Sequence, residues 1–191
     1  MKPLLKVIQL HKNQEYLIKK ALKNSRDAQQ ALYTMFAPKM LSHCRYYIND
    51  MHHAEEVMHN GFFKVFTQLQ SFQHQGSFEG WVRKIMTREA ISYLRQKKQM
   101  VFTETEHALS EESPVLADSQ LSVEIIQNAI DGLPEGYKTV FVMYAIEGYK
   151  HHEIASELQI SVGTSKSQLF KARQLLQQQL EELNATHYGT K

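Results

Sequence analysis

The sequence GYKHHEIASELQISVGTSKSQLFKAR, residues 148–173, determines how the rest of the chain is interpreted. Apolar side chains recur on one face of a first predicted helix, at Ile154, Ala155 and Leu158. Residues 159–161 form a turn, and the hydroxyl of Ser161 can cap a second helix that begins at Val162. Two amphipathic helices joined by so short a turn predict a helix-turn-helix.

The polar side chains of the second helix suit the groove of a nucleic-acid duplex. Short hydroxyls, an amide and cations are the groups that contact phosphates and base edges. The candidates near the free end and on the outer face of this helix are Thr164, Ser165, Lys166, Ser167, Gln168 and Lys171. A packed helical hairpin with a solvated polar face has the same periodicity, so this pattern alone leaves both interpretations open.

Composition excludes several classes of protein. The chain has 191 residues, enough for one domain or two small ones, and its formal net charge is only +2, so any affinity for nucleic acid must come from local patches. Cys44 is the single cysteine, which excludes an internal disulfide and fits a reducing cytoplasm. The longest apolar run, residues 140–146, is far shorter than the roughly 20 residues that span a bilayer, so we expect no stable membrane insertion.

The chain is expected to be almost entirely helical, because no segment alternates apolar and polar residues long enough to predict a sheet. Asp27 can cap a helix that Pro38 then kinks or ends. Asp50 can cap the next helix, whose expected core residues are Met58, Phe62, Val65 and Leu69. The opposite face of that helix is either solvated or a docking site, and it carries Glu56, His59, Asn60 and Phe63.

Residues 69–80 form a predicted surface loop that contains Phe72, His74 and Phe78. Aromatic rings are unusual in a loop, and they either serve a function or fold back into the core. The helix that follows is basic, and one of its faces carries Trp81, Lys84, Arg88 and Arg95. A ring among cations suits single-stranded nucleic acid, and a plain solvated basic face explains the pattern equally well.

An acidic segment separates this half of the chain from the helix-turn-helix. Residues 100–124 hold six acidic side chains and no Lys or Arg, a composition that predicts a flexible linker. A second domain is expected from about residue 121, with a helix that begins at Pro134 and a last helix packed through Leu169, Ala172, Leu176, Leu180 and Leu183. The predicted fold is all-α, with two helical domains joined by an acidic flexible linker, and the second domain is a helix-turn-helix.

The phrase EIASELQISVGTSKSQLFKAR, residues 153–173, resembles the promoter-reading domain of bacterial sigma factors. Three stretches of the first half resemble the other domain of the same family: DAQQALYTMFAPKMLSHC, HHAEEVMHNGFFKVFTQL and GSFEGWVRKIMTREAISYLRQ. Their order and the acidic linker are similar to the short extracytoplasmic-function (ECF) subfamily. The resemblance implies a region-2-like domain at residues 1–99, a linker at 100–120 and a region-4-like domain at 121–191.

The resemblance also implies a role for each surface, with promoter DNA and core RNA polymerase as partners and with no cofactor or metal. The residues implied to bind core polymerase are Glu56, His59, Asn60 and Phe63. Those implied to capture and melt the minus-ten element are Phe72, Gln73, His74, Gln75, Gly76, Ser77, Trp81, Lys84, Arg88 and Arg95. Those implied to contact the minus-thirty-five duplex are Thr164, Ser165, Lys166, Ser167, Gln168, Lys171 and Arg173. An inhibitory anti-sigma partner is left open.

A metalloenzyme is the first rival interpretation, because the chain has ten histidines. The Glu-x-x-His spacing of di-iron helical bundles occurs at Glu56 and His59, and again at Glu104 and His107 in the expected linker. A zinc-protease helix needs a second histidine where Ser156 stands. These departures favour a protein that is not an enzyme.

An autonomous regulator that binds operators as a dimer is the second rival. In that case the first half of the chain would be a sensor or a dimerisation domain. The helix that resembles the polymerase-binding helix of sigma factors favours the sigma-factor interpretation. A requirement for core polymerase distinguishes the two.

Overall fold

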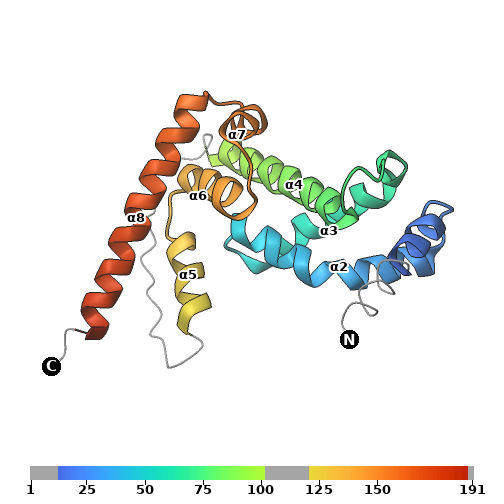
Figure 1. Ribbon diagram of the computed structural model, residues 1–191, viewed down its shortest axis with the longest axis horizontal. Helices are drawn as coiled ribbons and strands as arrows, with labels where there is room; N and C mark the ends of the chain where they lie inside the picture. The colour runs from blue at the N-terminus through green and yellow to red at the C-terminus, as the bar shows by residue number, and fades with distance from the viewer. Residues whose placement is uncertain (1–12, 102–120, 189–191) are drawn as a thin grey trace, which may run out of the picture. The chain divides into compact units, whose positions relative to one another are not determined.

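The computed structural model describes residues 13–101 and 121–188, and every regular element among them is helical (Figure 1). This confirms the predicted all-α fold. Contacts divide the chain into two compact units, with the boundary between Gln96 and Lys97. Almost all of the expected linker, residues 100–120, lies outside the described residues, so its flexibility stays a prediction. In the part of the chain that is described, no helix is long and apolar enough to cross a membrane.

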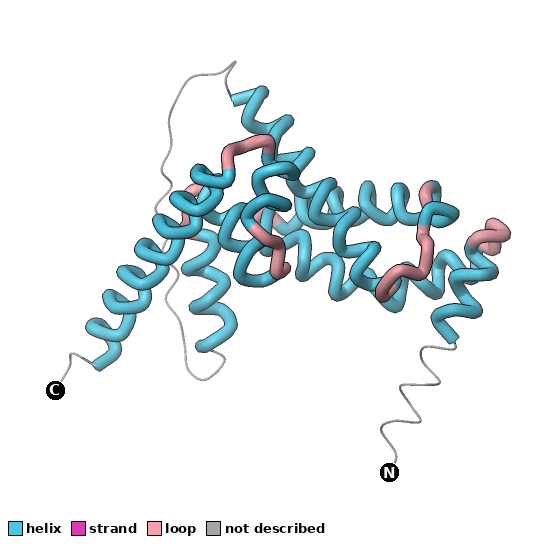
Figure 2. The backbone as a smooth tube through the Cα atoms, turned by 45° about the horizontal axis from the view of Figure 1, so that its top comes forward, coloured by secondary structure: helices cyan, strands magenta, loops and turns pink. Residues whose placement is uncertain are grey.

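The first unit begins with a helical segment over residues 13–21. It continues with α2 (Arg26–Tyr47), α3 (Met51–Thr67), the short 3-10 helix η1 (Leu69–Ser71) and α4 (Phe78–Val101), whose last turn passes the unit boundary. Residues 72–77 form the loop between η1 and α4, drawn in pink in Figure 2. Because α2 packs along α3, the aromatic and aliphatic side chains of both helices share one core.

The start of α2 differs from the sequence prediction, and its course decides between the two alternatives left open at Pro38. Ser25, two residues before Asp27, is the N-cap, and its hydroxyl accepts a hydrogen bond from the backbone N–H of Ala28. Pro38 lies inside one continuous helix rather than at a junction between two. The hydroxyl of Ser42 donates to the carbonyl of Pro38, at 3.1 Å, which gives that carbonyl a local side-chain partner.

The structure confirms the predicted face and cap of α3. The Asp50 carboxylate accepts a hydrogen bond from the backbone N–H of His53, at 3.0 Å, which also holds the pKa of Asp50 below its usual value. The core residues expected from the helical spacing are buried, namely Met58, Phe62, Val65 and Leu69. One polar contact also lies inside the unit, where His43 Nε2 of α2 meets Thr87 Oγ1 of α4 at 2.9 Å.

The second unit contains α5 (Leu121–Asp131), α6 (Glu135–Phe141), the π-helix η2 (Val142–Ile146), α7 (His151–Leu158) and α8 (Val162–Tyr188). The sequence predicted that this helix begins at Pro134. In the structure Pro134 is the N-cap, and α6 begins one residue later, at Glu135. Lys138 is only 3% exposed, and its Nζ lies 3.2 Å from Asp131 Oδ1, so this buried cation has an acidic partner.

The helix-turn-helix forms where the sequence predicts it. Gly148 ends the preceding helix with a φ of +75°, a conformation that glycine adopts without a steric penalty. Gln159 closes α7 in the left-handed region, and the Ser161 hydroxyl accepts from the Thr164 N–H at 2.9 Å at the start of α8. The carboxylate of Glu153 accepts from the backbone N–H of Lys150 at 2.8 Å and completes the start of α7.

The packing stripe of α8 is shorter than the sequence predicts. Leu169 and Ala172 are buried, Leu176 is half-buried, and Leu180 is 41% exposed. Among the described residues, α6 and α7 pack most closely on α8, and α5 packs on it less extensively. The inclusion of Leu180 in the stripe was therefore wrong.

Candidate functional site

The outer face of α8 displays most of the residues expected to meet duplex DNA. Four of them are exposed, namely Lys166, Ser167, Lys171 and Arg173, while Thr164 and Gln168 are half-buried. The amide of Gln168 lies beside Gly136, near the beginning of α6. This helix therefore offers three cations and a hydroxyl to solvent on one side of the unit.

Ser165 does not belong to that face, and its assignment as a DNA-contacting residue was wrong. Its side chain is buried, and Ser165 Oγ lies 2.9 Å from His151 Nδ1 at the start of α7. Residues four and seven positions apart share a helix face, so Ser165 points inward together with Leu169 and Ala172. The hydroxyl holds α7 to α8 instead of facing solvent.

Two of the α8 cations lie over tyrosine rings. Lys171 Nζ is 5.8 Å from the ring centroid of Tyr137 in α6, and Arg173 Cζ is 5.7 Å from that of Tyr144 in η2. Both distances fall within the range in which a cation is attracted to the face of a ring. Sequence reasoning did not assign either tyrosine to the site. The signal was a pair of tyrosines seven residues apart, close to two turns of a helix.

The pKa of His151 is affected by two of these cations. Partial burial lowers its pKa from the usual value of 6.5, and the positive charges of Lys166 and Arg173 lower it further. The ring of His151 also stacks on Tyr144, with centroids 4.6 Å apart and planes inclined by 24°. Burial is therefore the main reason that the charged form of His151 is disfavoured, and the two cations add to it.

The basic face of α4 keeps its expected exposure. Lys84, Arg88 and Arg95 are exposed, and Trp81 is half-buried. The two acidic residues of α4 form ion pairs with other cations. Glu79 binds Lys39 at 2.9 Å and Arg83 at 3.1 Å, and the bond from Lys39 is the main reason that its pKa is lowered; Glu89 binds Lys64 of α3. Both carboxylates therefore have a cation partner other than Lys84.

The loop between η1 and α4 joins an aromatic cluster at one end and projects into solvent at the other. Phe78 is buried, and Phe72 is half-buried with its ring centroid 4.6 Å from His74, 5.2 Å from Phe78 and 5.5 Å from Trp81. The exposed residues of this loop are Gln73, His74, Gln75, Gly76 and Ser77. Backbone φ angles of +57° at His74 and +102° at Gly76 bend the loop here. Of the two alternatives that the sequence left open, folding back into the core is confirmed for Phe78, whereas Phe72 stays at the rim.

The face of α3 that resembles the polymerase-binding helix is open to solvent. Glu56, His59 and Asn60 are exposed, and Phe63 is 71% exposed, which is unusual for so large an apolar side chain. His59 Nε2 lies 3.0 Å from the hydroxyl of Tyr33, so α2 helps to orient this imidazole. The surface therefore combines a carboxylate, two polar groups and one apolar ring.

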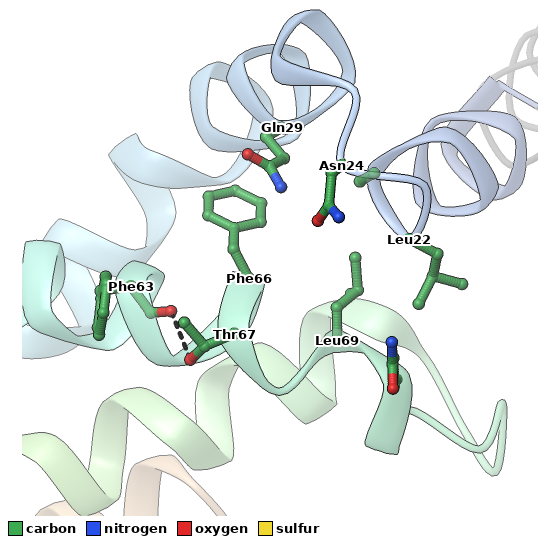
Figure 3. A pocket seen from close by; sticks show the side chains of 9 residues that line it. Leu22, Asn24, Gln29, Phe63, Phe66, Thr67 and Leu69 are labelled. Atoms are coloured by element: carbon green, nitrogen blue, oxygen red, sulfur yellow. Dashed lines mark hydrogen bonds between the residues drawn. The ribbon is translucent and has the colours of Figure 1, made fainter.

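A groove that sequence reasoning missed begins beside Phe63. It has a volume of about 460 Å³ and is lined by the segment after the first helix, by α2, by the end of α3 and by η1. Figure 3 shows Phe66 projecting from α3 toward Gln29, with Leu22 and Leu69 to one side. The groove depends on contacts between segments that are far apart in the sequence, and no local sequence pattern reveals such contacts.

The Glu-x-x-His pair at Glu56 and His59 makes other contacts in the structure. Among the described residues, no group of three or more His, Cys, Asp or Glu side chains could hold a metal ion. The carboxylate of Glu56 lies 3.6 Å from His53 Nδ1, and His59 bonds to Tyr33. The second Glu-x-x-His pair, Glu104 and His107, lies outside the described residues.

Comparison with known families divides the chain in the same way as its motifs. Residues 32–100 match the family described as Sigma-70 region 2, and residues 123–176 match Sigma-70, region 4. The region-2 match covers α3, the aromatic loop and α4, and the region-4 match covers the helix-turn-helix and the exposed cations of α8. Because the chain contains both regions, the alternative interpretation as an autonomous operator-binding regulator is not favoured.

Individual relatives agree with this assignment. The ECF RNA polymerase sigma factor SigW of Bacillus subtilis is 30% identical over 179 residues, which cover 87% of this chain and 96% of SigW. The RNA polymerase sigma-H factor of Pseudomonas aeruginosa is 25% identical, over 88% of this chain and 94% of its own length. The sigma factor RpoE of Bartonella quintana, solved in complex with the anti-sigma factor NepR, has a similar fold, with a TM-score of 0.56 at 19% identity over 82% of this chain and 98% of its own. The chain therefore belongs to the ECF sigma factors of the sigma-70 family, which bind core RNA polymerase and direct transcription to specific promoters.

Proposed function

We propose that this sigma factor divides its work among three surfaces, each assigned to a particular set of residues. The outer face of α8 reads the minus-thirty-five duplex, the aromatic loop and α4 capture the melted minus-ten strand, and the exposed face of α3 binds core polymerase. The observation that carries the proposal is the segregation on α8, where Lys166, Lys171 and Arg173 are exposed while Ser165 and Leu169 are buried on the opposite side.

The α8 surface suits duplex DNA because its charges are accessible and its neutral face is used for packing. Lys166, Lys171 and Arg173 neutralise phosphates, while Ser167 and Gln168 approach base edges. Thr164 lies in the first turn of the helix, close to where backbone N–H groups attract anions. Ser165 supports this surface from below through His151.

The loop and α4 suit a strand that has been opened. An unstacked base gains stacking energy on an aromatic ring, and Phe72 with its neighbours Trp81 and His74 offers such rings at the rim of the first unit. Lys84, Arg88 and Arg95 supply the cations that a strand backbone needs. The exposed residues 73–77 receive the base that leaves the stack.

The α3 surface suits a protein partner. An exposed aromatic ring beside polar and acidic side chains is typical of the anchor of a protein interface. Phe63 is that anchor, and Glu56 sets the charge of the contact. His59 and Asn60 complete the polar surround.

The remaining assignments follow from this division. Residues 1–99 form the polymerase- and minus-ten-binding domain, 100–120 the acidic linker and 121–191 the minus-thirty-five-binding domain. The chain makes and breaks no covalent bond, and binding free energy is its whole output. It acts in the cytoplasm, where polymerase and promoters are. An anti-sigma factor is a further candidate partner, by analogy with the complex of RpoE and NepR.

The α8 assignment is tested by salt dependence. Replacing Lys166→Ala together with Arg173→Ala lowers promoter affinity and reduces the slope of log K against log salt by up to about 1.8, since each lost phosphate contact contributes about 0.9. The matched control is Lys19→Ala with Lys23→Ala, which removes the same charge from exposed positions of the first unit. Equal slopes for the two double variants would reject the assignment.

The α3 assignment is tested by titration with core polymerase. Phe63→Ala and Glu56→Arg each weaken binding, because the first removes an apolar anchor and the second reverses a charge at the contact. Glu15→Arg makes the same charge reversal at an exposed position of the first helical segment and leaves affinity unchanged. If Glu56→Arg and Glu15→Arg bound equally well, α3 would not be the docking surface.

A further inference from the structure

The two tyrosines beneath the α8 cations have no assigned role, although they lie directly under residues proposed to meet DNA. Tyr137 and Tyr144 are both half-buried and come from consecutive helices, α6 and η2. Lys171 lies over the ring of Tyr137, and Arg173 lies over the ring of Tyr144. Each tyrosine therefore presents one face to a cation that is otherwise exposed to solvent.

A chain of contacts holds the ring of Tyr144 in place. Its ring stacks on His151 at a centroid distance of 4.6 Å, and His151 Nδ1 lies 2.9 Å from the buried hydroxyl of Ser165. Ser165 and Arg173 both belong to α8, so the contacts leave that helix, pass through α7 and η2, and return to it. The position of the Tyr144 ring is thus fixed relative to the helix that carries Arg173.

A long cationic side chain loses rotamer freedom when it binds a phosphate. A ring that already restricts the side chain in the free protein reduces that loss, which raises affinity without any new contact to DNA. Arginine benefits in particular, because its planar guanidinium can lie on a ring and still direct N–H groups outward to a phosphate.

We propose that Tyr137 and Tyr144 are positioning residues, which hold Lys171 and Arg173 in the orientation that contacts the phosphates of the minus-thirty-five duplex. The inference rests on the proposed role of α8. It adds that part of the affinity of this helix comes from the ordering of its cations before DNA is bound. Tyr144, which His151 braces, has the larger effect of the two.

The test compares Tyr144→Phe, which keeps the ring, with Tyr144→Leu, which removes it. Each variant is assembled with core polymerase and titrated with a labelled genomic duplex that the wild-type holoenzyme retains on a filter, at several salt concentrations. Tyr144→Leu weakens binding by about two- to fivefold and lowers the salt slope, as expected for the loss of one exposed cation–π contact. Tyr144→Phe binds within about twofold of wild type.

The Arg173→Ala background separates positioning from packing. If Tyr144 acts through Arg173, Tyr144→Leu has no further effect on affinity or salt slope in that background. An equal loss in both backgrounds would assign Tyr144 a purely structural role and overturn the inference. Tighter binding by Tyr144→Leu would also overturn the inference, because it would mean that the ring holds the guanidinium away from DNA.

The same series distinguishes failure of the inference from failure of the proposed function. If Arg173→Ala weakens binding while Tyr144→Leu does not, α8 reads DNA and the positioning role of Tyr144 is wrong. If Arg173→Ala leaves affinity unchanged, Arg173 does not contact DNA, and the inference falls with that assignment. Tyr137→Leu in the presence and absence of Lys171→Ala provides the parallel comparison.

Discussion

Gly61 of α3 lies directly against Met86 of α4, so that a methyl group added at Gly61 would overlap the sulfur atom of Met86. Both residues are buried, and Met86 is fully enclosed. The absence of a side chain at Gly61 therefore lets α3, which carries the proposed polymerase surface, approach α4, which carries the proposed strand-binding surface.

Gly61→Val is expected to destabilise the protein by about 1–3 kcal/mol, because it overpacks a closed contact. Urea denaturation measures the change. Asn60→Val is the control, since it adds the same branched side chain at the adjacent exposed position. Met86→Ala in the Gly61→Val background should restore part of the loss, and a double variant less stable than both single variants would contradict this account of the contact.

Ser165→Ala is expected to lower the free energy of unfolding by about 0.5–1.5 kcal/mol, the usual net value of one hydrogen bond. The reason is that the hydroxyl bonds to His151 inside the second unit. Thr164→Ala, which removes a half-buried hydroxyl from the same turn, provides the comparison for DNA binding. An unchanged free energy of unfolding for Ser165→Ala would contradict a stabilising hydrogen bond to His151.

His151 makes stability depend on pH in a defined direction. Its folded-state pKa lies below 6.5, chiefly because of burial and then because of Lys166 and Arg173, so the unfolded chain binds a proton more readily than the folded one. The stability contributed by neutral His151 is complete above about pH 6.5 and declines as the pH falls from there toward the lower folded pKa.

Thermal unfolding of wild type and of His151→Gln, between about pH 5 and pH 8, checks this dependence. The difference in midpoint between the two proteins should shrink as the pH falls below about 6.5. The difference is used because the chain has nine other histidines, which both proteins share. A difference that stays constant across the range, or grows in acid, would contradict the lowered pKa.

Cys44 is expected to be unreactive in the folded protein. It is fully buried in α2, and burial, reinforced by the charge of Glu89, raises the pKa of its thiol to about 12. The nucleophilic thiolate is therefore scarce at neutral pH. A chromogenic disulfide reagent measures the rate, with Ser42→Cys in a Cys44→Ala background as an exposed thiol on the same helix. Similar rates for the two proteins would contradict the burial of Cys44.

Sequence reasoning succeeded where a strong periodic signal existed. The spacing of Met58, Phe62 and Val65 predicted the buried face of α3, because large apolar side chains at helical intervals leave little freedom of choice. The turn of the helix-turn-helix was predicted for a similar reason, since Gln159 and Ser161 separate two clear apolar patterns.

Sequence reasoning failed where small or polar residues decide the structure. Ser165 carries no hydrophobic signal, although its spacing from Leu169 and Ala172 would have placed it on the buried face. Ser25 and Asp27 are both good helix caps two residues apart, and residue type alone does not choose between them. The stacking of Arg173 on Tyr144 depends on how α8 packs against η2, which no local pattern contains.

The central claim, that the exposed cations of α8 select promoters for core polymerase, is tested most directly by mapping RNA 5′ ends made from genomic DNA by reconstituted polymerase. Core polymerase with the wild-type protein should produce a set of start sites that core polymerase alone does not. The Lys166→Ala and Arg173→Ala double variant should lose those sites, while the Lys19→Ala and Lys23→Ala control retains them. The same start sites with the α8 double variant as with wild type would contradict the claim.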